Sequence, residues 1–432
     1  MSSRINLTRR TLAAVLTASL APWTRARTPA TRAASATRVI VIGAGFGGAT
    51  CAKYLKLLSP ATDVLLLDRR PTFLTGPFSN LAIAGLRPLQ RITRRVAAIG
   101  RAHRAAALQT EVTELDPAAL RVTTASGRQY RADRIVVSPG IAVRWGLIEG
   151  LDADNSDAMP HAWLGDAQVL ALRERLRSVP DGGTILIGAP PNPYRCPPGP
   201  YERASLMAYV LKSTGRTRAK IIVADAKDDF SKSALFKLEW DTLYPGMIEW
   251  VSRSSGGEVT RVDTASGEVW LRGAAKPLRT QLASVIPAQR AAEVAVRAGL
   301  ADETGWCPVN ADNFQSQKYP GVHVIGDAAL GAPIPKSAFA ANSQAKLCAS
   351  AIAAALSGAA APRARLLNTC YSLLSPNAAI SVSGLYESQG GKLAIMSEGM
   401  SPLSGDAELR SREARQAYAW YDSITFDSFG TI

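Results

Sequence analysis

The hydrophobic and polar positions of residues 38–68 follow a strand–helix–strand pattern. Residues 38–43 form an apolar run that predicts a strand buried on both faces of a parallel sheet. A helix is expected through residues 49–58, and a second apolar strand over residues 64–67 ends at Asp68. This order is typical of the first βαβ unit of an α/β dinucleotide-binding fold.

The turn between the first strand and the helix is rich in glycine, with the sequence Gly-Ala-Gly-Phe-Gly-Gly. Gly43 permits the tight turn, Gly45 lets the backbone approach a pyrophosphate, and Gly48 allows close packing of helix on strand. Asp68 lies 20 residues after Gly48, where an acid accepts hydrogen bonds from ribose hydroxyls. The pattern therefore predicts a dinucleotide site.

A second segment indicates that this dinucleotide is FAD. Residues 319–327 predict a short strand that ends in Gly326 and Asp327, as in flavin enzymes whose aspartate contacts the ribityl chain. A helix expected from about Ser337 would point its N-terminus at the flavin, where a partial positive charge favours the reduced anion. Residues 134–140 resemble the strand and turn that leave an FAD domain.

A further strand, over residues 184–188, is followed by prolines where a second dinucleotide turn would stand. Pro190, Pro191 and Pro193 have no N–H to donate to a pyrophosphate, so a nicotinamide site is not expected here. A type II NADH dehydrogenase is disfavoured for the same reason. Cys196 stands in this loop instead, which suggests a thiol-based electron donor.

The composition describes a globular protein of two or three domains: 432 residues, 47% hydrophobic and 20% charged. The net charge is +15, and residues 1–36 contribute six arginines and no acidic residue. The twin-arginine pattern at residues 8–12, a short apolar run and the small residues 34–36 predict a twin-arginine signal peptide. We therefore expect export of the folded protein to the periplasm.

Several function classes find no support. The chain has no basic stripe interleaved with aromatic residues, so no nucleic-acid partner is expected, and no later segment has the roughly 18 apolar residues of a membrane span. His103, His161 and His323 are scattered, so no metal site is expected, and His161 is interpreted as structural. No Cys-x-x-Cys-His motif is present for a c-type haem.

Thiol chemistry at Cys196 needs a second sulfur, and four other cysteines are available. Cys51 and Cys348 are expected inside helices, where free cysteine packs as a small hydrophobic residue. Cys307 is ambiguous, and Cys370 opens the C-terminal region after a break rich in alanine, proline and glycine. Composition does not choose among them.

The chain resembles the flavoprotein subunit of flavocytochrome c sulfide dehydrogenase over essentially its whole mature length. The resemblance is most specific at two cysteine motifs. These are Arg-Cys-Pro-Pro-Gly-Pro-Tyr-Glu-Arg around Cys196 and Leu-Asn-Thr-Cys-Tyr around Cys370. The other segments that resemble the family are residues 43–56, 160–163, 305–308, 324–327, 335–337, 341–344 and 418–421.

The resemblance implies a function and a set of site residues. Cys196 and Cys370 would form a disulfide beside the flavin, with Glu202 as a candidate proton acceptor and Lys336 as a candidate cation at the flavin edge. Sulfide, or a related persulfide or thiol, would open this disulfide, and FAD would pass electrons singly to a c-type cytochrome. Which cysteine faces the flavin stays open. A moderately basic surface suits steering toward an acidic cytochrome.

One departure from the family concerns how FAD is held. Members of the family can carry FAD covalently through a cysteine, but the matching segment here, residues 73–80, has Gly76 in that place. Because glycine cannot form a thioether, we predict FAD that is bound tightly and non-covalently.

Two alternatives to the cytochrome-linked enzyme are retained. A sulfide:quinone oxidoreductase shares the fold and the cysteines but needs a membrane anchor, for which the C-terminal tail offers no clean apolar face. A low-turnover accessory flavoprotein that supports a sulfur-oxidising complex is the other.

The predicted fold class is α/β, with two Rossmann-like domains of the disulfide-reductase type and a C-terminal α+β interface region. After the signal peptide (1–36), a discontinuous FAD-binding domain covers 37–149 and 288–360 and encloses the second domain (150–287). The C-terminal region covers 363–432 and carries Cys370. Aromatic residues at 414–429 suit an interface with the cytochrome, or packing within the protein itself.

Overall fold

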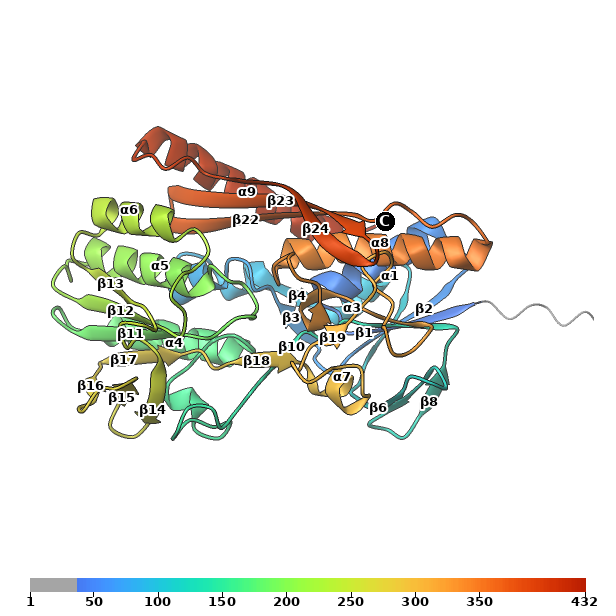
Figure 1. Ribbon diagram of the computed structural model, residues 1–432, viewed down its shortest axis with the longest axis horizontal. Helices are drawn as coiled ribbons and strands as arrows, with labels where there is room; N and C mark the ends of the chain where they lie inside the picture. The colour runs from blue at the N-terminus through green and yellow to red at the C-terminus, as the bar shows by residue number, and fades with distance from the viewer. Residues whose placement is uncertain (1–36) are drawn as a thin grey trace, which may run out of the picture. The chain divides into compact units, whose positions relative to one another are not determined.

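A five-stranded parallel sheet forms the first part of the protein. The computed structural model describes residues 37–432, which form one unit, and the predicted signal peptide lies outside the described residues. Helices α1 (Phe46–Leu58) and α8 (Ala338–Ser357) pack against each other beside this sheet (Figure 1). The sheet order is β20 (Val322–Val324), β9 (Arg134–Val137), β1 (Arg38–Ile42), β2 (Asp63–Asp68) and β5 (Ala106–Gln109).

A second parallel sheet follows the same plan. Its strands are almost fully buried at the centre, which explains why they appear in the sequence as continuous apolar runs. Helices α4 (Asp166–Ser178), α5 (Gly199–Ser213) and α6 (Ser233–Leu243) connect and cover it. The order is β13 (Ile248–Val251), β12 (Lys220–Asp225), β11 (Thr184–Ala189) and β17 (Leu282–Val285).

The chain passes between the two sheets through a pair of antiparallel strands, β10 (Ile141–Val143) and β18 (Gln289–Ala291). The prediction of two Rossmann-like units is confirmed. The predicted limits of the domains stay a prediction. Smaller elements complete both units: β3 (Thr72–Leu74), β4 (Thr93–Arg95), α2 (Ser79–Ile83), α3 (Val96–Ala102), β6 (Val112–Asp116), β7 (Arg121–Thr124), β8 (Gln129–Arg131), β14 (Val259–Asp263), β15 (Glu268–Leu271), β16 (Leu278–Arg279), α7 (Glu293–Arg297), β19 (Cys307–Pro308) and β21 (Ala329–Leu330).

The C-terminal region is an antiparallel meander with a long helix packed on it. Its strands are β22 (Arg365–Ser375), β23 (Ala378–Gln389) and β24 (Lys392–Met400), and helix α9 (Ala407–Phe429) covers β23. Strand β22 contacts both α8 of the first unit and α5 of the second, as its path across both in Figure 1 shows. The meander therefore bridges the two Rossmann-like units.

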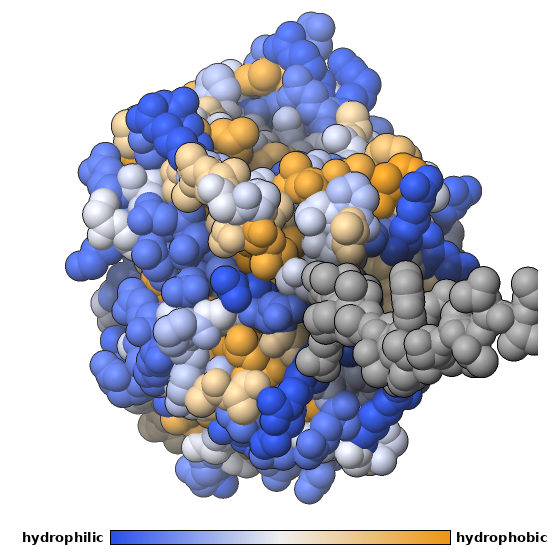
Figure 2. All heavy atoms as spheres, turned by 90° about the vertical axis from the view of Figure 1, so that its right-hand side faces the viewer, coloured by the Kyte–Doolittle hydropathy of each residue, from blue (hydrophilic) through white to orange (hydrophobic). Residues whose placement is uncertain are grey.

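The surface mixes polar and apolar residues. Figure 2 shows one face, on which separate orange hydrophobic patches lie within a mostly hydrophilic surface. No helix in residues 37–432 is long and apolar enough to cross a membrane. Across the same residues, no group of three or more His, Cys, Asp or Glu side chains is placed to hold a metal ion.

Candidate functional site

The glycine turn after β1 has the geometry that a bound pyrophosphate requires. Gly43 adopts a φ of +98°, and a Cβ there would lie 2.2 Å from the carbonyl oxygen of Ser138. A Cβ on Gly48 would lie 1.8 Å from the carbonyl oxygen of Gly43. Gly45 is the N-cap of α1, and no side chain caps the helix. The N–H groups of its first turn are therefore available to an anion.

Asp68 at the end of β2 fastens this turn. Its Oδ2 accepts a hydrogen bond from the N–H of Ala44 at 2.8 Å, and its Oδ1 accepts one from the N–H of Arg70 at 2.9 Å. The predicted contact of Asp68 with a ribose stays a prediction. The structure adds a role that the spacing did not indicate, because the carboxylate also holds the glycine turn in place.

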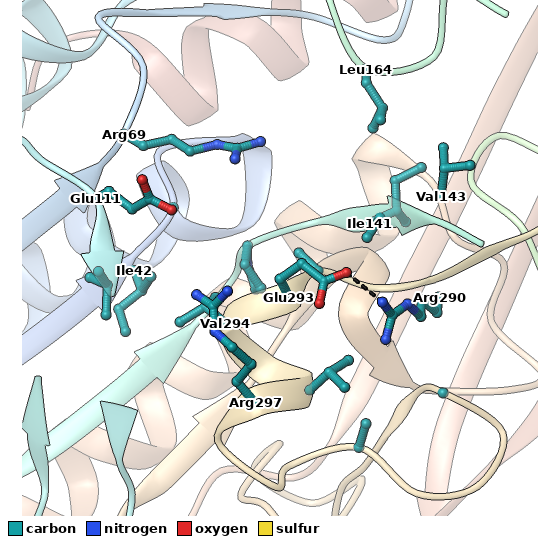
Figure 3. Close-up of a pocket in the computed structure, with 18 of the residues that line it drawn as sticks. Ile42, Arg69, Glu111, Ile141, Val143, Leu164, Arg290, Glu293, Val294 and Arg297 are labelled. Carbon is teal, nitrogen blue, oxygen red and sulfur yellow. Dashed lines mark hydrogen bonds and ion pairs between the residues drawn. The ribbon is translucent and has the colours of Figure 1, made fainter. Parts of the chain in front are cut away.

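A cavity of 810 Å³ begins at Gly43 and Asp68 and reaches the β10–β18 connection. Figure 3 shows side chains from both regions facing it, with Arg290 paired to Glu293 at 2.5 Å. Its size is within the range of cofactor pockets. Together with the uncapped N-terminus of α1, it fits a dinucleotide such as FAD. Six arginines lie around it and suit a diphosphate: Arg69, Arg70, Arg144, Arg195, Arg290 and Arg297.

Gly326 and Asp327 follow β20, as predicted, at the start of a 3₁₀ turn (Gly326–Ala328). The N–H of Gly326 donates to Oε1 of Gln344 in α8 at 2.7 Å. The carboxylate of Asp327 lies 4.0 Å from the guanidinium of Arg195. Burial raises the pKa of Asp327, while Arg195 and Lys336 oppose that shift. These contacts tie the Gly-Asp turn to the loop of Cys196.

Lys336 lies beside this turn and is held by the backbone. Its Nζ donates to the carbonyl oxygens of Asp327 and Ala329, each at 2.8 Å, and lies 3.7 Å from the centre of the Trp306 ring. Burial lowers the pKa of Lys336 to about 8. Helix α8 begins two residues later at Ala338, with Ser337 as its N-cap. The role of Lys336 at the flavin edge stays a prediction.

The loop of Cys196 is anchored to the same region. The N–H of Cys196 donates to the carbonyl oxygen of Lys336 at 2.8 Å, and the backbone of Cys196 is left-handed, with a φ of +59°. A Cβ on Gly199 would lie 3.2 Å from the Cys196 sulfur and 2.8 Å from the Trp163 ring. Glycine at this position therefore leaves room for the sulfur. Burial raises the pKa of the Cys196 thiol to about 12.

Cys370 reaches the same place from β22. Its Sγ donates to Oδ1 of Asn368 at 3.5 Å, and that oxygen also accepts from the hydroxyl of Ser337 at 2.6 Å. Burial raises the pKa of Cys370, and the charge of Cys370 adds to the rise in the pKa of Cys196. The predicted disulfide stays a prediction.

Glu202, in the first turn of α5, links three elements. Its Oε1 accepts from the Asn80 side chain of α2 at 2.9 Å, and its Oε2 accepts from the N–H of Leu373 in β22 at 3.0 Å. Burial raises the pKa of Glu202. Both carboxylate oxygens accept hydrogen bonds. The proposed part of Glu202 in proton transfer stays a prediction. Its structural part is clear, since it holds the Cys370 strand against α5.

The other cysteines lie elsewhere. Cys51 in α1 and Cys348 in α8 are fully buried and interact with each other, and Cys307 is buried in β19. His161 is also structural, as expected: its Nδ1 accepts from the N–H of Trp163 at 3.0 Å, and burial lowers its pKa to about 4.

The protein's own side chains fill the place of a second nucleotide. Asp225 ends β12 as Asp68 ends β2, but it is fully buried. Its Oδ2 accepts from the hydroxyl of Tyr201 at 2.6 Å and from Nε1 of Trp250 at 2.9 Å. Its Oδ1 accepts from Nζ of Lys227 at 2.5 Å. An acid that would face a ribose is therefore satisfied internally, in agreement with the prolines of the preceding turn.

Lys232 is the residue of this site that sequence reasoning missed. It precedes α6 and donates to the hydroxyl of Ser372 in β22 at 2.8 Å. The ammonium lowers the pKa of both Cys196 and Cys370, although burial outweighs it. No motif marked it, because a single lysine in a loop is normally exposed.

Fold and site together define a flavin-type oxidoreductase with two Rossmann-like units, a large cavity at the glycine turn of the first, and two cysteines, Cys196 and Cys370, anchored to the segment before α8. Residues 169–287 match the central region of the sulfide dehydrogenase (flavocytochrome c) flavoprotein chain. Residues 362–429 match the flavin-binding region of flavocytochrome c sulphide dehydrogenase, and residues 37–187 match pyridine nucleotide-disulphide oxidoreductases.

Similar proteins agree with these matches. The sulfide dehydrogenase (flavocytochrome c) flavoprotein chain of Chlorobaculum thiosulfatiphilum is 54% identical over 43 residues, which are 10% of this chain and 90% of that sequence. The mitochondrial sulfide:quinone oxidoreductase of Mus musculus is 25% identical over 321 residues, 71% of this chain and 68% of that one. This chain belongs to the family of the flavocytochrome c sulfide dehydrogenase flavoprotein chain.

A solved structure supports the fold in particular. The sulfide:quinone oxidoreductase from the hyperthermophilic bacterium Aquifex aeolicus superposes with a TM-score of 0.73 at 19% identity, covering 91% of this chain and 92% of that chain.

Proposed function

We propose that this chain is a periplasmic, FAD-dependent sulfide dehydrogenase that works through a Cys196–Cys370 disulfide and passes electrons singly to a c-type cytochrome. The observation that carries the proposal is that the loop of Cys196 and the strand of Cys370 are both anchored to the segment Lys336–Ser337. Cys196 hydrogen-bonds to Lys336, which leads into α8, and Cys370 shares Asn368 with Ser337 at the start of that helix. The N-terminal twin-arginine pattern supports the periplasmic location.

The chemistry of the pair begins with thiol–disulfide exchange. Hydrosulfide attacks one sulfur of the Cys196–Cys370 bond, so that a new S–S bond forms as the old one breaks and the other cysteine leaves as a thiolate. FAD, when bound, supplies an acceptor that takes up two electrons and gives them up one at a time. The glycine turn and Asp68 would hold its diphosphate and ribose.

We propose that this FAD is non-covalent. A Cβ at Gly76 would meet nothing within 4 Å, so packing does not require glycine at that position. The cysteine side chain that can carry the thioether in other family members is absent here, because residue 76 is glycine. FAD would then be retained by the cavity and the N-terminus of α1.

The acceptor distinguishes two candidate functions. A cytochrome partner is supported by the family and by four exposed hydrophobic residues on the edge strand β24 and the loop after it: Ile395, Met396, Met400 and Leu403. A quinone acceptor is supported by the similarity to the sulfide:quinone oxidoreductases of mouse and of Aquifex aeolicus. We favour the cytochrome, because the family matches include both the central and the flavin-binding regions.

The test is an anaerobic titration of the purified holoprotein, with sulfide and separately with NADH, while the visible flavin absorbance is recorded. We expect bleaching by sulfide, which Cys196→Ser and Cys370→Ser abolish and the buried control Cys307→Ser retains. Reoxidation by a c-type cytochrome but not by a soluble quinone would support the acceptor. Bleaching by NADH would contradict the filled nucleotide position, and bleaching by neither donor would leave the accessory role.

A further inference from the structure

Lys232 is a buried cation in the loop just before α6, and it contacts the strand that carries Cys370. The residue is only 6% exposed and has a left-handed backbone, with a φ of +64°. Its Nζ donates to the Ser372 hydroxyl at 2.8 Å and lies 5.8 Å from the centre of the Phe236 ring. Each of these contacts fixes where the ammonium stands.

The charge of Lys232 has no close counter-ion. Among the described residues no carboxylate lies within 4.0 Å of its Nζ. Lys53, which is equally buried, differs in that it donates to two backbone carbonyls, those of Phe426 and Asp427. Burying an ammonium without an anion is costly. The serine hydroxyl and the aromatic ring carry no charge, and the carboxylates of Glu202 and Glu413 lie beyond ion-pair distance, which points to an anion that forms closer to the ammonium.

Strand geometry identifies the position of that anion. Residues two apart on a strand share a face, so Ser372 and Cys370 project from the same side of β22. The ammonium bonded to Ser372 therefore stands next to the Cys370 side chain. Four charged or titratable groups act on the Lys232 ammonium, and Cys370 has the largest effect. The other three are Glu202 of α5, Cys196 of its loop and Glu413 of α9.

We propose that Lys232 is a positioning residue that stabilises the thiolate of Cys370 when the disulfide opens, and so directs hydrosulfide to the sulfur of Cys196. This proposal rests on the proposed function and deepens it. In the step, the sulfur of hydrosulfide bonds to Cys196 as the Cys196–Cys370 bond breaks. The electron pair of that bond leaves on Cys370 beside the ammonium, and Cys196 carries the persulfide. A thiol that is stabilised as the anion is the better leaving group.

The electrostatics of the two thiols agree with this direction. Burial raises the pKa of Cys196 to about 12, with the carboxylate of Glu202 and with Cys370 adding to the rise. Burial also raises the pKa of Cys370, but Lys232 is the largest influence that opposes the rise there. The Lys232 ammonium therefore acts more directly on the Cys370 thiol than on the Cys196 thiol, where it is a minor influence.

The test measures thiolate formation without sulfide, so its failure is distinct from a failure of the proposed function. The holoprotein is reduced, freed of reductant and alkylated with iodoacetamide between pH 6 and 10, and the modified peptides of both cysteines are counted by mass spectrometry. In the wild type we expect Cys370 to be alkylated faster than Cys196 at every pH in this range. Equal or reversed rates would overturn the proposal with no variant needed.

Variants separate the charge from the packing. Lys232→Gln keeps a polar chain near Ser372 but removes the charge, and we expect Cys370 to react about tenfold more slowly at pH 8, one pKa unit. Lys232→Arg should restore the rate, and Lys237→Met, at an exposed lysine of the helix that follows Lys232, should not change it. An unchanged Cys370 rate in a folded Lys232→Gln protein would refute the role of Lys232.

Discussion

Replacing Arg410 of α9 with methionine removes one partner of a buried ion-pair network. The Nε of Arg410 donates to Glu239 of α6 at 2.6 Å, and one terminal nitrogen donates to Glu413 at 2.9 Å. The other terminal nitrogen donates to the carbonyl oxygens of Pro402 and Ser404. None of the three charged side chains is more than 8% exposed. The network thus holds α9 to the second unit.

The expected loss follows from the charge that stays behind. Methionine replaces much of the volume of Arg410, but Glu239 and Glu413 would keep buried carboxylates without a cation. Removing one partner of a buried ion pair costs about 3 to 5 kcal/mol. We therefore expect Arg410→Met to lower the free energy of unfolding by about 4 kcal/mol, which is a large part of the roughly 5 to 15 kcal/mol of a typical domain.

Urea unfolding followed by circular dichroism measures this change. Arg412→Met, at an exposed position of the same helix, is the control and should stay within about 0.5 kcal/mol of the wild type. Adding Glu239→Gln and Glu413→Gln to Arg410→Met should recover most of the loss, because no uncompensated charge is then buried. A loss below about 1 kcal/mol for Arg410→Met would refute the argument.

Three other outcomes are expected. Acid precipitation of the holoprotein should release the flavin into the supernatant, and a yellow pellet would contradict non-covalent binding. Met400→Asp, which places a charge next to the exposed hydrophobic residues of β24, should raise the KM for a c-type cytochrome about tenfold, roughly 1.4 kcal/mol, without changing flavin reduction by sulfide. Burial lowers the pKa of His103, His161 and His323 to about 4, so the unfolded chain takes up their protons first as the pH falls below about 6.5. Stability should therefore decline from pH 6.5 to 5 by up to about 1.4 kcal/mol per pH unit for each histidine, and a flat profile in urea unfolding would argue against it.

The first βαβ unit could be predicted because its signals are local. The apolar run of β1, the glycine turn and the acid at Asp68 all appear where the sequence places them. The helix begins three residues earlier than predicted, at Phe46 instead of residue 49. Glycine disfavours helices, yet Gly48 lies within the first turn of α1. Glycine is required at this position because any side chain would clash with the carbonyl oxygen of Gly43.

The C-terminal tail could be assigned to a helix only from the structure. Of its aromatic residues, Tyr421 stacks on Phe78 with ring centres 4.2 Å apart, and Phe429 packs on Phe46 at 5.0 Å. Phe426 is 67% exposed. Which aromatic side chain faces the core depends on partners more than 300 residues away in the chain, so the sequence left packing and interface equally open.

The same reason explains which parts of the site the sequence missed. The two cysteines are carried by specific motifs, but the contact of Lys232 with Ser372 joins residues 140 positions apart. The satisfied carboxylate of Asp225 depends on Trp250 and Tyr201, neither of which carries a motif. Buried polar groups of this kind are recognised by their partners, and partners come from the tertiary fold.

Helix α5 shows how one element replaces nucleotide binding with thiol chemistry. In a dinucleotide site, the N-terminus of the helix after the strand faces the pyrophosphate. Here the first turn of α5 presents Tyr201 to Asp225 and Glu202 to the backbone of β22. A carboxylate in the first turn takes the place of the anion that the helix dipole favours. Cys196 lies three residues before the start of this helix. The first turn of α5 therefore both closes the nucleotide position and holds the Cys370 strand next to the Cys196 loop.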